Sequence, residues 1–441
     1  MPTIQQLFTQ HIEQLQLRVA DVLEREQLEA LIIHSGYPLR IFLDDQHYPF
    51  QTNPHFKHWL PLTEHPHCWL VVNGVDKPTL IYHQANDYWH KAASSPSGFW
   101  VDFFDIRVMK HPQDIEPFLP KQRQRCAYIG EHPELAEALE IGERNPELVL
   151  NYLHYYRAYK TDYELECIQE ANHRAVKAHL VAKELFLAGA SEFEMNLAYL
   201  SSLGRGEHSL PYANIIALNE NASILHYTAL SASKLAEQKR YSLLIDAGAE
   251  YRGYAADITR SYAYRKGLFA ELVLEMDILQ QSLVNDLKPG YRYTDLHLKA
   301  HRKLAKLLVD FEFVYCSAAA AVETGITRCF FPHGLGHHLG LQVHDVGGLM
   351  QDEDGTVLAA PTLDPFLRCT RMLEPRQVLT IEPGLYFIPS LLAELAESEH
   401  TRLINWSRVD EMRRFGGIRI EDNVVITALN CDNLTRAGNW S

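Results

Sequence analysis

Two aspartates in the second half of the chain have the spacing of a folded-back pair. Asp246 ends an apolar, strand-like segment, and Asp257 follows eleven residues later, beyond a glycine-containing stretch that can turn the chain. Carboxylates at this spacing converge when the two segments form a hairpin. Because aspartate is also a favoured turn residue, turn capping explains the pair more simply when it is taken alone.

A histidine-rich loop follows the two aspartates. It contains His333, His337, His338 and His344, and glycines beside His337 let the backbone pass close to a ligand or ion. The spacings of four, one and six residues do not match a zinc-binding helix that uses only histidines. A polar loop with solvated histidines explains this loop equally well when it is taken alone.

Two glutamates lie where a charge is unexpected. Glu382 ends an apolar run and precedes a Pro-Gly turn, and Glu421 lies in the apolar segment 418–426. Buried carboxylates are rare unless they are paired or bind a metal. For Glu421, a salt bridge to Arg419, two residues away on the same strand face, is the competing explanation.

Taken together, the two aspartates, the two glutamates and one histidine of the loop predict a metal site, which none of them predicts alone. Four carboxylates and one imidazole in one pocket repel each other unless two divalent cations balance the four negative charges. Oxygen-rich ligands with one histidine suit Mn²⁺, Co²⁺ or Zn²⁺, and Mn²⁺ is favoured. Two-metal sites hold and activate a water molecule for hydrolysis. The predicted ligands are Asp246, Asp257, His337, Glu382 and Glu421.

The order of these residues, with the motifs at 332–337 and 381–384, resembles the pita-bread metallopeptidases, which include methionine aminopeptidase, aminopeptidase P and prolidase. This resemblance covers the chain from about residue 160 to 441. Shorter segments resemble bacterial Xaa-Pro dipeptidases, some of which are also called organophosphorus acid anhydrolases. These segments are residues 42–45, 48–50, 53–54, 59–61, 87–90, 151–156 and 225–227.

The resemblance implies how the ions are held. Asp257 and Glu421 would bridge the two ions, Asp246 would bind one of them, and His337 with Glu382 would bind the other. The expected reaction is hydrolysis of Xaa-Pro dipeptides with a trans peptide bond, by a hydroxide that bridges the metals, with release of proline. Hydrolysis of organophosphate triesters and fluoridates is an expected side activity.

The resemblance also implies residues that act on the substrate. Glu382 would shuttle a proton, and three histidines would line the pocket and stabilise the oxyanion: His226, His333 and His344. Arg419 would help hold the terminal carboxylate of the dipeptide. Tyr212 and Asp45 would lie near the other end, and Asp45 would come from the partner subunit of a homodimer.

Two alternatives and one departure stay open. An aminopeptidase P acts on longer Xaa-Pro peptides, and a non-enzymatic binding protein can share the fold, although such proteins typically lack the ligands. His338 stands where bacterial prolidases often have proline. This is either a tolerated loop change or a source of altered loop stiffness or of an extra polar group near the metals.

The elements that must position these residues follow from patterning. Capping boxes at Thr161 and Ser191 predict two helices, the first reaching about Leu187, and further helices are expected over 268–285 and 294–309. Strands are expected over 242–246, 378–381 and 418–426. In the first third we expect a helix over 4–28, an ordered loop over 44–61, and strands over 30–33, 69–72, 79–82 and 127–129. The predicted fold class is α/β (α+β), with a small N-terminal α/β domain (1–158) and a pita-bread catalytic domain (159–441).

Charge and cysteine content limit the partners and the compartment. The 441-residue chain has a formal net charge of −15, so nucleic acid is an unexpected partner. Seven scattered cysteines without a CxxC pair argue against disulfides and thiolate zinc sites and favour a reducing cytoplasm. We find no signal peptide and no apolar run of membrane-spanning length, and therefore expect no membrane partner.

Overall fold

The computed structural model describes residues 2–85, 88 and 93–437, and the chain divides into two compact units. The first comprises Met1–Cys167, Arg252–Tyr254 and Asp352–Thr356. The second comprises Ile168–Tyr251, Ala255–Gln351 and Val357–Ser441. None of the helices in the described part is both long and apolar enough to cross a bilayer. All seven cysteines are in described residues and carry free thiols.

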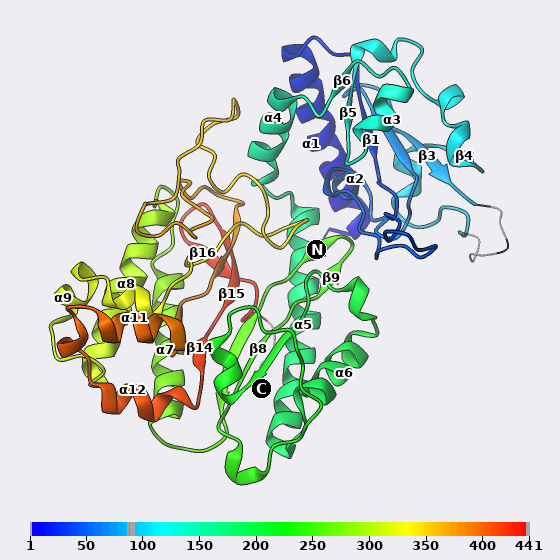
Figure 1. Ribbon diagram of the computed structural model, residues 1–441. Helices are drawn as coiled ribbons and strands as arrows, with labels where there is room; N and C mark the ends of the chain where they lie inside the picture. Colours follow the sequence, from blue (N-terminus) through cyan, green and yellow to red (C-terminus); the bar gives the residue numbers. More distant parts are fainter. Residues whose placement is uncertain (1, 86–87, 89–92, 438–441) are drawn as a thin grey trace. The chain divides into compact units, whose positions relative to one another are not determined.

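A six-stranded sheet of order β4-β3-β2-β1-β5-β6 forms the centre of the first unit (Figure 1). The apolar strand β1 is buried throughout, pairs antiparallel with β2 and runs parallel to β5. The strands are β1 (Ala30–His34), β2 (Trp69–Val72), β3 (Thr79–His83), β4 (Asp105–Met109), β5 (Cys126–Ile129) and β6 (Glu143–Arg144). The four strands predicted in this third are confirmed as β1, β2, β3 and β5.

Within the described residues, the α-helices that lie wholly in the first unit are α1 (Ile4–Arg25), α2 (Pro54–Trp59), α3 (Pro133–Ala138) and α4 (Glu147–Arg157). The N-terminal helix was predicted, whereas α2 lies inside a segment that was predicted to be a loop. The side chain of Asn53 accepts a hydrogen bond from the N–H of His55, and Pro54 occupies the first helical turn. An N-cap and a proline at this position start a helix, so the loop prediction for 44–61 was wrong there.

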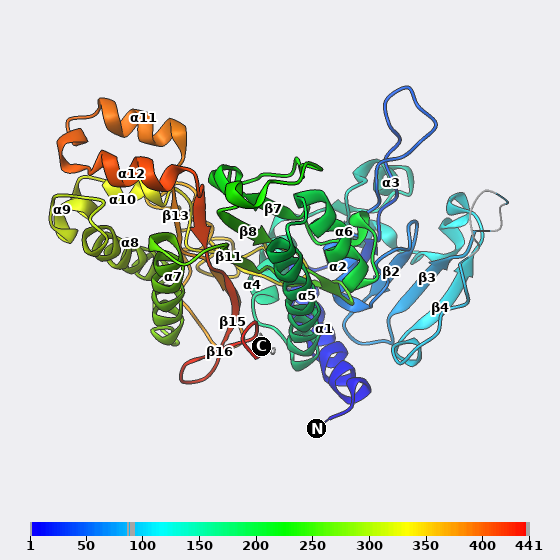
Figure 2. The ribbon, with the colours of Figure 1, turned by 90° about the horizontal axis from the view of Figure 1, so that it is seen from below.

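Within the described residues, a set of helices and several small sheets form the second unit. Three of these sheets have the orders β11-β8-β7, β12-β15-β16 and β13-β14, and β9 and β10 form a further two-stranded pair. Helix α7 packs against β11, β12, β14 and β16, and α8 packs beside α7 (Figure 2). The strands are β7 (Ile215–Leu218), β8 (Ser242–Asp246), β9 (Glu250–Tyr251), β10 (Tyr254–Ala255), β11 (Thr259–Ala263), β12 (Val378–Ile381), β13 (Gly384–Tyr386), β14 (Gly417–Arg419), β15 (Asp422–Ile426) and β16 (Cys431–Asn433).

Both predicted capping boxes are present at helix N-termini. The hydroxyl of Thr161 accepts a hydrogen bond from the N–H of Glu164, whose carboxylate accepts from the N–H of Thr161. Ser191 and Glu194 repeat this arrangement. The helices from this point are α5 (Asp162–Ala188), α6 (Glu192–Leu203), α7 (Leu268–Asn285), α8 (Tyr293–Asp310), α9 (Ala318–Glu323), α10 (Ile326–Phe330), α11 (Pro389–Glu397) and α12 (Trp406–Arg413).

The segment 418–426, predicted to be one strand, is two strands with a break between them. Strand β14 pairs with β13, whereas β15 pairs with β12. The chain changes partners at Ile420 and Glu421, and Glu421 forms an isolated bridge to Thr259. The break therefore brings a carboxylate from the C-terminal sheets next to the β8–β11 pair.

Candidate metal centre

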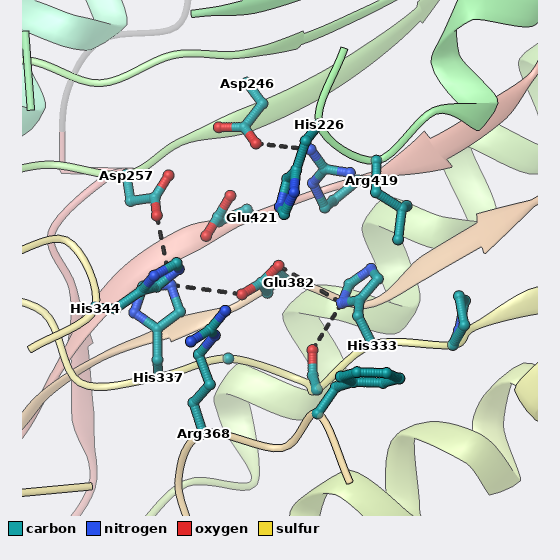
Figure 3. A pocket seen from close by; sticks show the side chains of 15 residues that line it. His226, Asp246, Asp257, His333, His337, His344, Arg368, Glu382, Arg419 and Glu421 are labelled. Atoms are coloured by element: carbon teal, nitrogen blue, oxygen red, sulfur yellow. Dashed lines mark hydrogen bonds and ion pairs between the residues drawn. The ribbon is translucent and has the colours of Figure 1, made fainter. Parts of the chain in front are cut away.

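The two aspartates lie at the same end of the β8–β11 pair. Asp246 is the last residue of β8 and is paired with Thr259, the first residue of β11. Asp257 precedes Thr259 by two residues. The antiparallel register thus brings both carboxylates into one pocket, as the hairpin expectation required (Figure 3).

Thr259 also fixes the position of Glu421. The N–H of Glu421 donates to the carbonyl of Thr259 over 3.0 Å, and the Thr259 hydroxyl donates to Glu421 Oε2 over 2.6 Å. Both side chains are buried. A neutral donor on one carboxylate oxygen orients the group and leaves the other oxygen available to a cation.

His337 and Glu382 come from a loop and a strand end that are hydrogen-bonded to each other. The N–H of Glu382, directly after β12, donates to the carbonyl of Leu335, and the N–H of His337 donates to Thr380 Oγ1. The Nδ1 of His337 lies 2.9 Å from the carbonyl of His338 and donates to it. This bond orients the ring so that Nε2 faces the cavity, where it would serve as the ligand nitrogen for a bound ion.

The Nε2 atom of His337 faces two carboxylates. It lies 3.4 Å from Asp257 Oδ2 and 3.6 Å from Glu382 Oε1. One ligand atom each from Asp257, His337 and Glu421 lies within 4.8 Å of the others. The five predicted ligands all line one cavity of about 330 Å³.

The pKa values of the carboxyl groups reflect their burial close together. Burial raises the pKa of Glu382 to about 7, and burial raises those of Asp246 and Glu421 as well. Asp257 has a lowered pKa, because the hydrogen bond and charge of His337 outweigh its burial. Buried carboxyl groups that lie close together tend to stay protonated. They ionise when divalent cations neutralise their negative charge, so this donor set fits two metal ions.

Arg419 binds Asp246 rather than Glu421. Its NH2 donates to Asp246 Oδ2 over 2.7 Å, and its Nε donates to the Thr259 hydroxyl. Its NH1 donates to the hydroxyl of Tyr386 over 2.9 Å. The competing salt bridge with Glu421 is therefore absent among the described contacts, and the buried guanidinium is occupied by protein groups. Tyr212 donates a second hydrogen bond to Asp246, over 2.8 Å.

The three predicted pocket histidines have different environments. His333 Nδ1 donates to the carbonyl of Gly334, and its Nε2 lies 2.7 Å from the hydroxyl of Tyr386, which donates to it. Burial, then the charge of Arg419, lowers the pKa of His333 to about 3. The ring of His344 meets that of His337 edge-on at 4.4 Å, and burial lowers its pKa to about 4. His226 is exposed and lines the same cavity.

Arg368 was missed by the sequence analysis. It is exposed and lines the cavity, and in the described part of the chain its side chain has no hydrogen-bond or ion-pair partner (Figure 3). It lies in an irregular segment, so no periodic pattern marked it. Since the guanidinium of Arg419 is occupied, Arg368 is the cation available to a ligand in this cavity.

Three predicted features are not among the residues that line the cavity, or lie partly outside the described residues. Asp45 is exposed and belongs to the first unit. The side chain of His338 is buried, with its Nδ1 3.4 Å from the carbonyl of Val346, and it does not line the cavity. In the segment 87–90, only Tyr88 is within the described residues.

Comparison with known proteins gives two family matches. Residues 6–155 match the model of the Xaa-Pro dipeptidase N-terminal domain, and residues 166–428 match that of metallopeptidase family M24. A protein of Aeromonas hydrophila named Xaa-Pro dipeptidase is 55% identical over 436 residues, covering 99% of both chains. One of Shewanella baltica with the same name is 55% identical over 426 residues, covering 97% of this chain and 96% of its own.

The similar solved structures include aminopeptidase P of Escherichia coli. Its complex with the inhibitor Pro-Leu has a TM-score of 0.72 and 23% identity, covering 97% of this chain and 96% of that one. The zinc-substituted form with product has a TM-score of 0.70 at the same identity and coverage. At this identity the likeness shows the fold, which is the predicted combination of an N-terminal α/β part and a pita-bread part.

Proposed function

The chain belongs to metallopeptidase family M24, and on this premise we propose that it hydrolyses Xaa-Pro dipeptides with a trans peptide bond and releases proline. The observation that carries the proposal is the convergence of five ligand-type side chains, far apart in the sequence between residues 246 and 421, on one cavity. Relatives that are 55% identical over nearly their whole length, and are named Xaa-Pro dipeptidase, support the choice of substrate.

We propose that two divalent ions, preferably Mn²⁺ with Co²⁺ or Zn²⁺ as alternatives, are held by the five predicted ligands. Asp257 and Glu421 would bridge them, Asp246 would bind one, and His337 with Glu382 would bind the other. When bound, such a pair lowers the pKa of a shared water and polarises the scissile carbonyl. The predominance of carboxylate oxygens supports a hard cation such as Mn²⁺.

Glu382 is suited to moving a proton during the reaction. Its side chain lines the cavity, and its Oε1 lies 3.6 Å from Nε2 of His337, beside the proposed site of the attacking water. It would take the proton of the attacking water and deliver it to the proline nitrogen. His333 Nδ1 lies 3.7 Å from Glu382 Oε2, and the His333 ring would line the substrate pocket. His226 and His344, at the same cavity, would contact the oxyanion.

Charged protein groups at the two ends of the substrate pocket would select peptides of dipeptide length. We assign the proline carboxylate to Arg368, since its side chain is exposed in the cavity and has no described ion-pair partner. Arg419 would act indirectly, by holding Asp246 through the 2.7 Å ion pair. Tyr212 would do the same from the other oxygen of Asp246. Asp45, from the partner of a homodimer, would meet the substrate amino group.

Other parts of the proposal concern the whole chain. We place the domain boundary at 158/159, where α4 has ended and α5 is about to begin. Seven free thiols are consistent with the reducing cytoplasm as the compartment. Organophosphate hydrolysis would be a side activity, because the same activated water can attack tetrahedral phosphorus.

The proposal is tested by initial rates on Leu-Pro, Leu-Gly and Leu-Pro-Gly in the presence of Mn²⁺. We expect cleavage of Leu-Pro alone. Cleavage of Leu-Pro-Gly instead would identify an aminopeptidase P, and no peptide cleavage would leave phosphoester hydrolysis or ligand binding to be considered. Comparable rates on cis-locked and trans-locked analogues would contradict the expected isomer selectivity.

A further inference from the structure

A second group of ligand-type side chains lies outside the five described above. His297 and His301 are one turn apart on α8, so their rings project from the same face of the helix. Asp364 meets them from the loop 361–367. All three are buried, with exposed fractions of 1%, 1% and 8%. The proposed hydrolysis uses none of them.

The ligand atoms of this cluster are already spaced like those around a metal ion. The two Nε2 atoms lie 3.2 Å apart, and Asp364 Oδ1 lies 3.4 Å from His297 Nε2 and 3.8 Å from His301 Nε2. A tetrahedral zinc ion with bonds of about 2.0–2.1 Å separates its ligand atoms by about 3.3–3.4 Å. The three atoms therefore outline one face of such a tetrahedron.

Neighbouring groups orient two of the three ligands. His301 Nδ1 lies 3.0 Å from the hydroxyl of Thr327, and Arg328 donates from Nε and NH2 to the two oxygens of Asp364, over 2.7 and 3.0 Å. Hydrogen bonds of this kind fix the ring and the carboxylate at metal sites. His297 Nδ1 is buried and has no hydrogen-bond partner among the described residues.

We propose that His297, His301 and Asp364 bind a third divalent cation, of the zinc type, with water as its fourth ligand. Asp364 borders a cavity of about 110 Å³, through which water or an ion would reach its carboxylate. Three protein ligands and one open position form a tetrahedral zinc site. Two imidazoles make zinc a better occupant than Mn²⁺, which prefers oxygen.

Charge sets the order in which the sites fill. Burial, followed by the charge of His297, lowers the pKa of His301 to about 3, so the ring is neutral at physiological pH and its lone pair is available. Arg328 already balances Asp364, so an added ion leaves net positive charge in a buried site. The third ion therefore binds more weakly than the pair bound by four carboxylates.

The third ion would act on the wall of the catalytic cavity. It would fasten α8 to the loop that leads into Phe366 and Arg368, both of which line that cavity. The rings of His297 and His301 also pack against Phe331, which precedes the cavity-lining residues Pro332 and His333. The ion would thus stiffen both segments on this side of the pocket.

The first test counts zinc ions per chain. Metal-free protein is loaded with excess Zn²⁺, passed through a gel-filtration column and measured by inductively coupled plasma mass spectrometry. We expect three ions per chain in the unaltered protein and two in His301→Ala, whereas exposed His111→Ala keeps three. Saturation of the unaltered protein at two ions, or an unchanged count in folded His301→Ala, would overturn the proposal.

The second test removes the catalytic centre from the measurement. The double variant Asp257→Asn/Glu421→Gln should keep one zinc ion, which addition of His297→Ala should abolish. The unaltered protein can also be titrated with Co²⁺, which needs no variant. The third equivalent of Co²⁺ should add a visible absorption band with the intensity typical of tetrahedral Co²⁺. Absence of this third-equivalent band would contradict the site, whether or not the protein cleaves dipeptides.

Discussion

At the scale of single residues, two carboxylates of the candidate metal centre have separate protein partners. Asp246 is held by Arg419 and Tyr212, and Glu421 is held by Thr259. The residue types were readable from the sequence, because a charge in an apolar run is conspicuous. These partners were not readable, because they come from segments more than 30 residues away and include neutral hydroxyls.

Thr259→Val removes the hydroxyl that donates to Glu421 and accepts from Arg419, at nearly constant volume. We expect the affinity for one of the two metal ions to fall about 10–100-fold, since outer-shell hydrogen bonds typically contribute this much. Calorimetric titration of the metal-free protein with Mn²⁺ measures this affinity. Thr259→Ser keeps the hydroxyl and should bind as the unaltered protein does; equal affinities of the Val and Ser variants would contradict the assignment.

Arg368→Met removes the cation assigned to the proline carboxylate. We expect KM for Leu-Pro to rise about 10–100-fold with a smaller change in kcat, because a charge-assisted hydrogen bond contributes about 1.5–3 kcal/mol. Exposed Arg402→Met is the matched control and should leave KM unchanged. Leu-Pro-amide lacks the carboxylate and should be insensitive to the change; an equal loss on both substrates would argue against the contact.

At the scale of elements, the sequence predicted strands that are apolar throughout and helices that begin with capping boxes. Strand β8 and helix α7 have the predicted bounds. The break at Ile420 and Glu421 was missed, because both sides of it are apolar and only the pairing of β14 and β15 with different strands creates it. Helix α2 was missed because Pro, His and aromatic residues obscured a short capped turn.

Gly336→Ala tests the packing of the histidine loop against β12. A Cβ atom there would lie 2.2 Å from the carbonyl oxygen of Thr380 and 2.4 Å from the hydroxyl of Tyr293. We expect a loss of about 1–3 kcal/mol in unfolding free energy, measured by chemical denaturation, and weaker metal binding through displaced His337. Gly206→Ala has open space around it and should be neutral. Wild-type stability of Gly336→Ala would refute this packing.

At the scale of the whole molecule, the sequence could predict the α/β class and named five side chains that line one cavity, but it could not predict the burial that shifts their pKa values. The four carboxylates come from β8, the segment before β11, the end of β12 and the β14–β15 break. Their shared burial depends on how three small sheets assemble, which local patterns do not encode. The same is true of Arg368, whose role depends on what surrounds it.

Burial of Glu382 makes the stability of the metal-free protein depend on pH. Its folded pKa of about 7 exceeds the ordinary value of 4.5, so the folded state binds more protons between these values. The contribution of Glu382 to the unfolding free energy is therefore complete below about pH 4.5 and is lost as the pH rises through 7. We expect the thermal midpoint of chelated protein to fall from pH 5 to pH 8. A thermal midpoint that rises between pH 5 and pH 8 would contradict the burial of a protonated Glu382.

Saturation with Mn²⁺ should reverse that trend. Bound cations displace the protons, so metal affinity and the stabilisation it brings increase with pH. The comparison uses the same protein and buffers with and without Mn²⁺. Parallel curves would show that the ions do not bind at these carboxylates.

The central claim is that metal held by these side chains is required for cleavage of Leu-Pro. The most direct measurement is the initial rate on Leu-Pro as chelated protein is titrated with Mn²⁺, with bound metal counted at each step. We predict no activity without metal, and full activity near two bound ions per chain. Full activity after complete removal of metal would contradict the account.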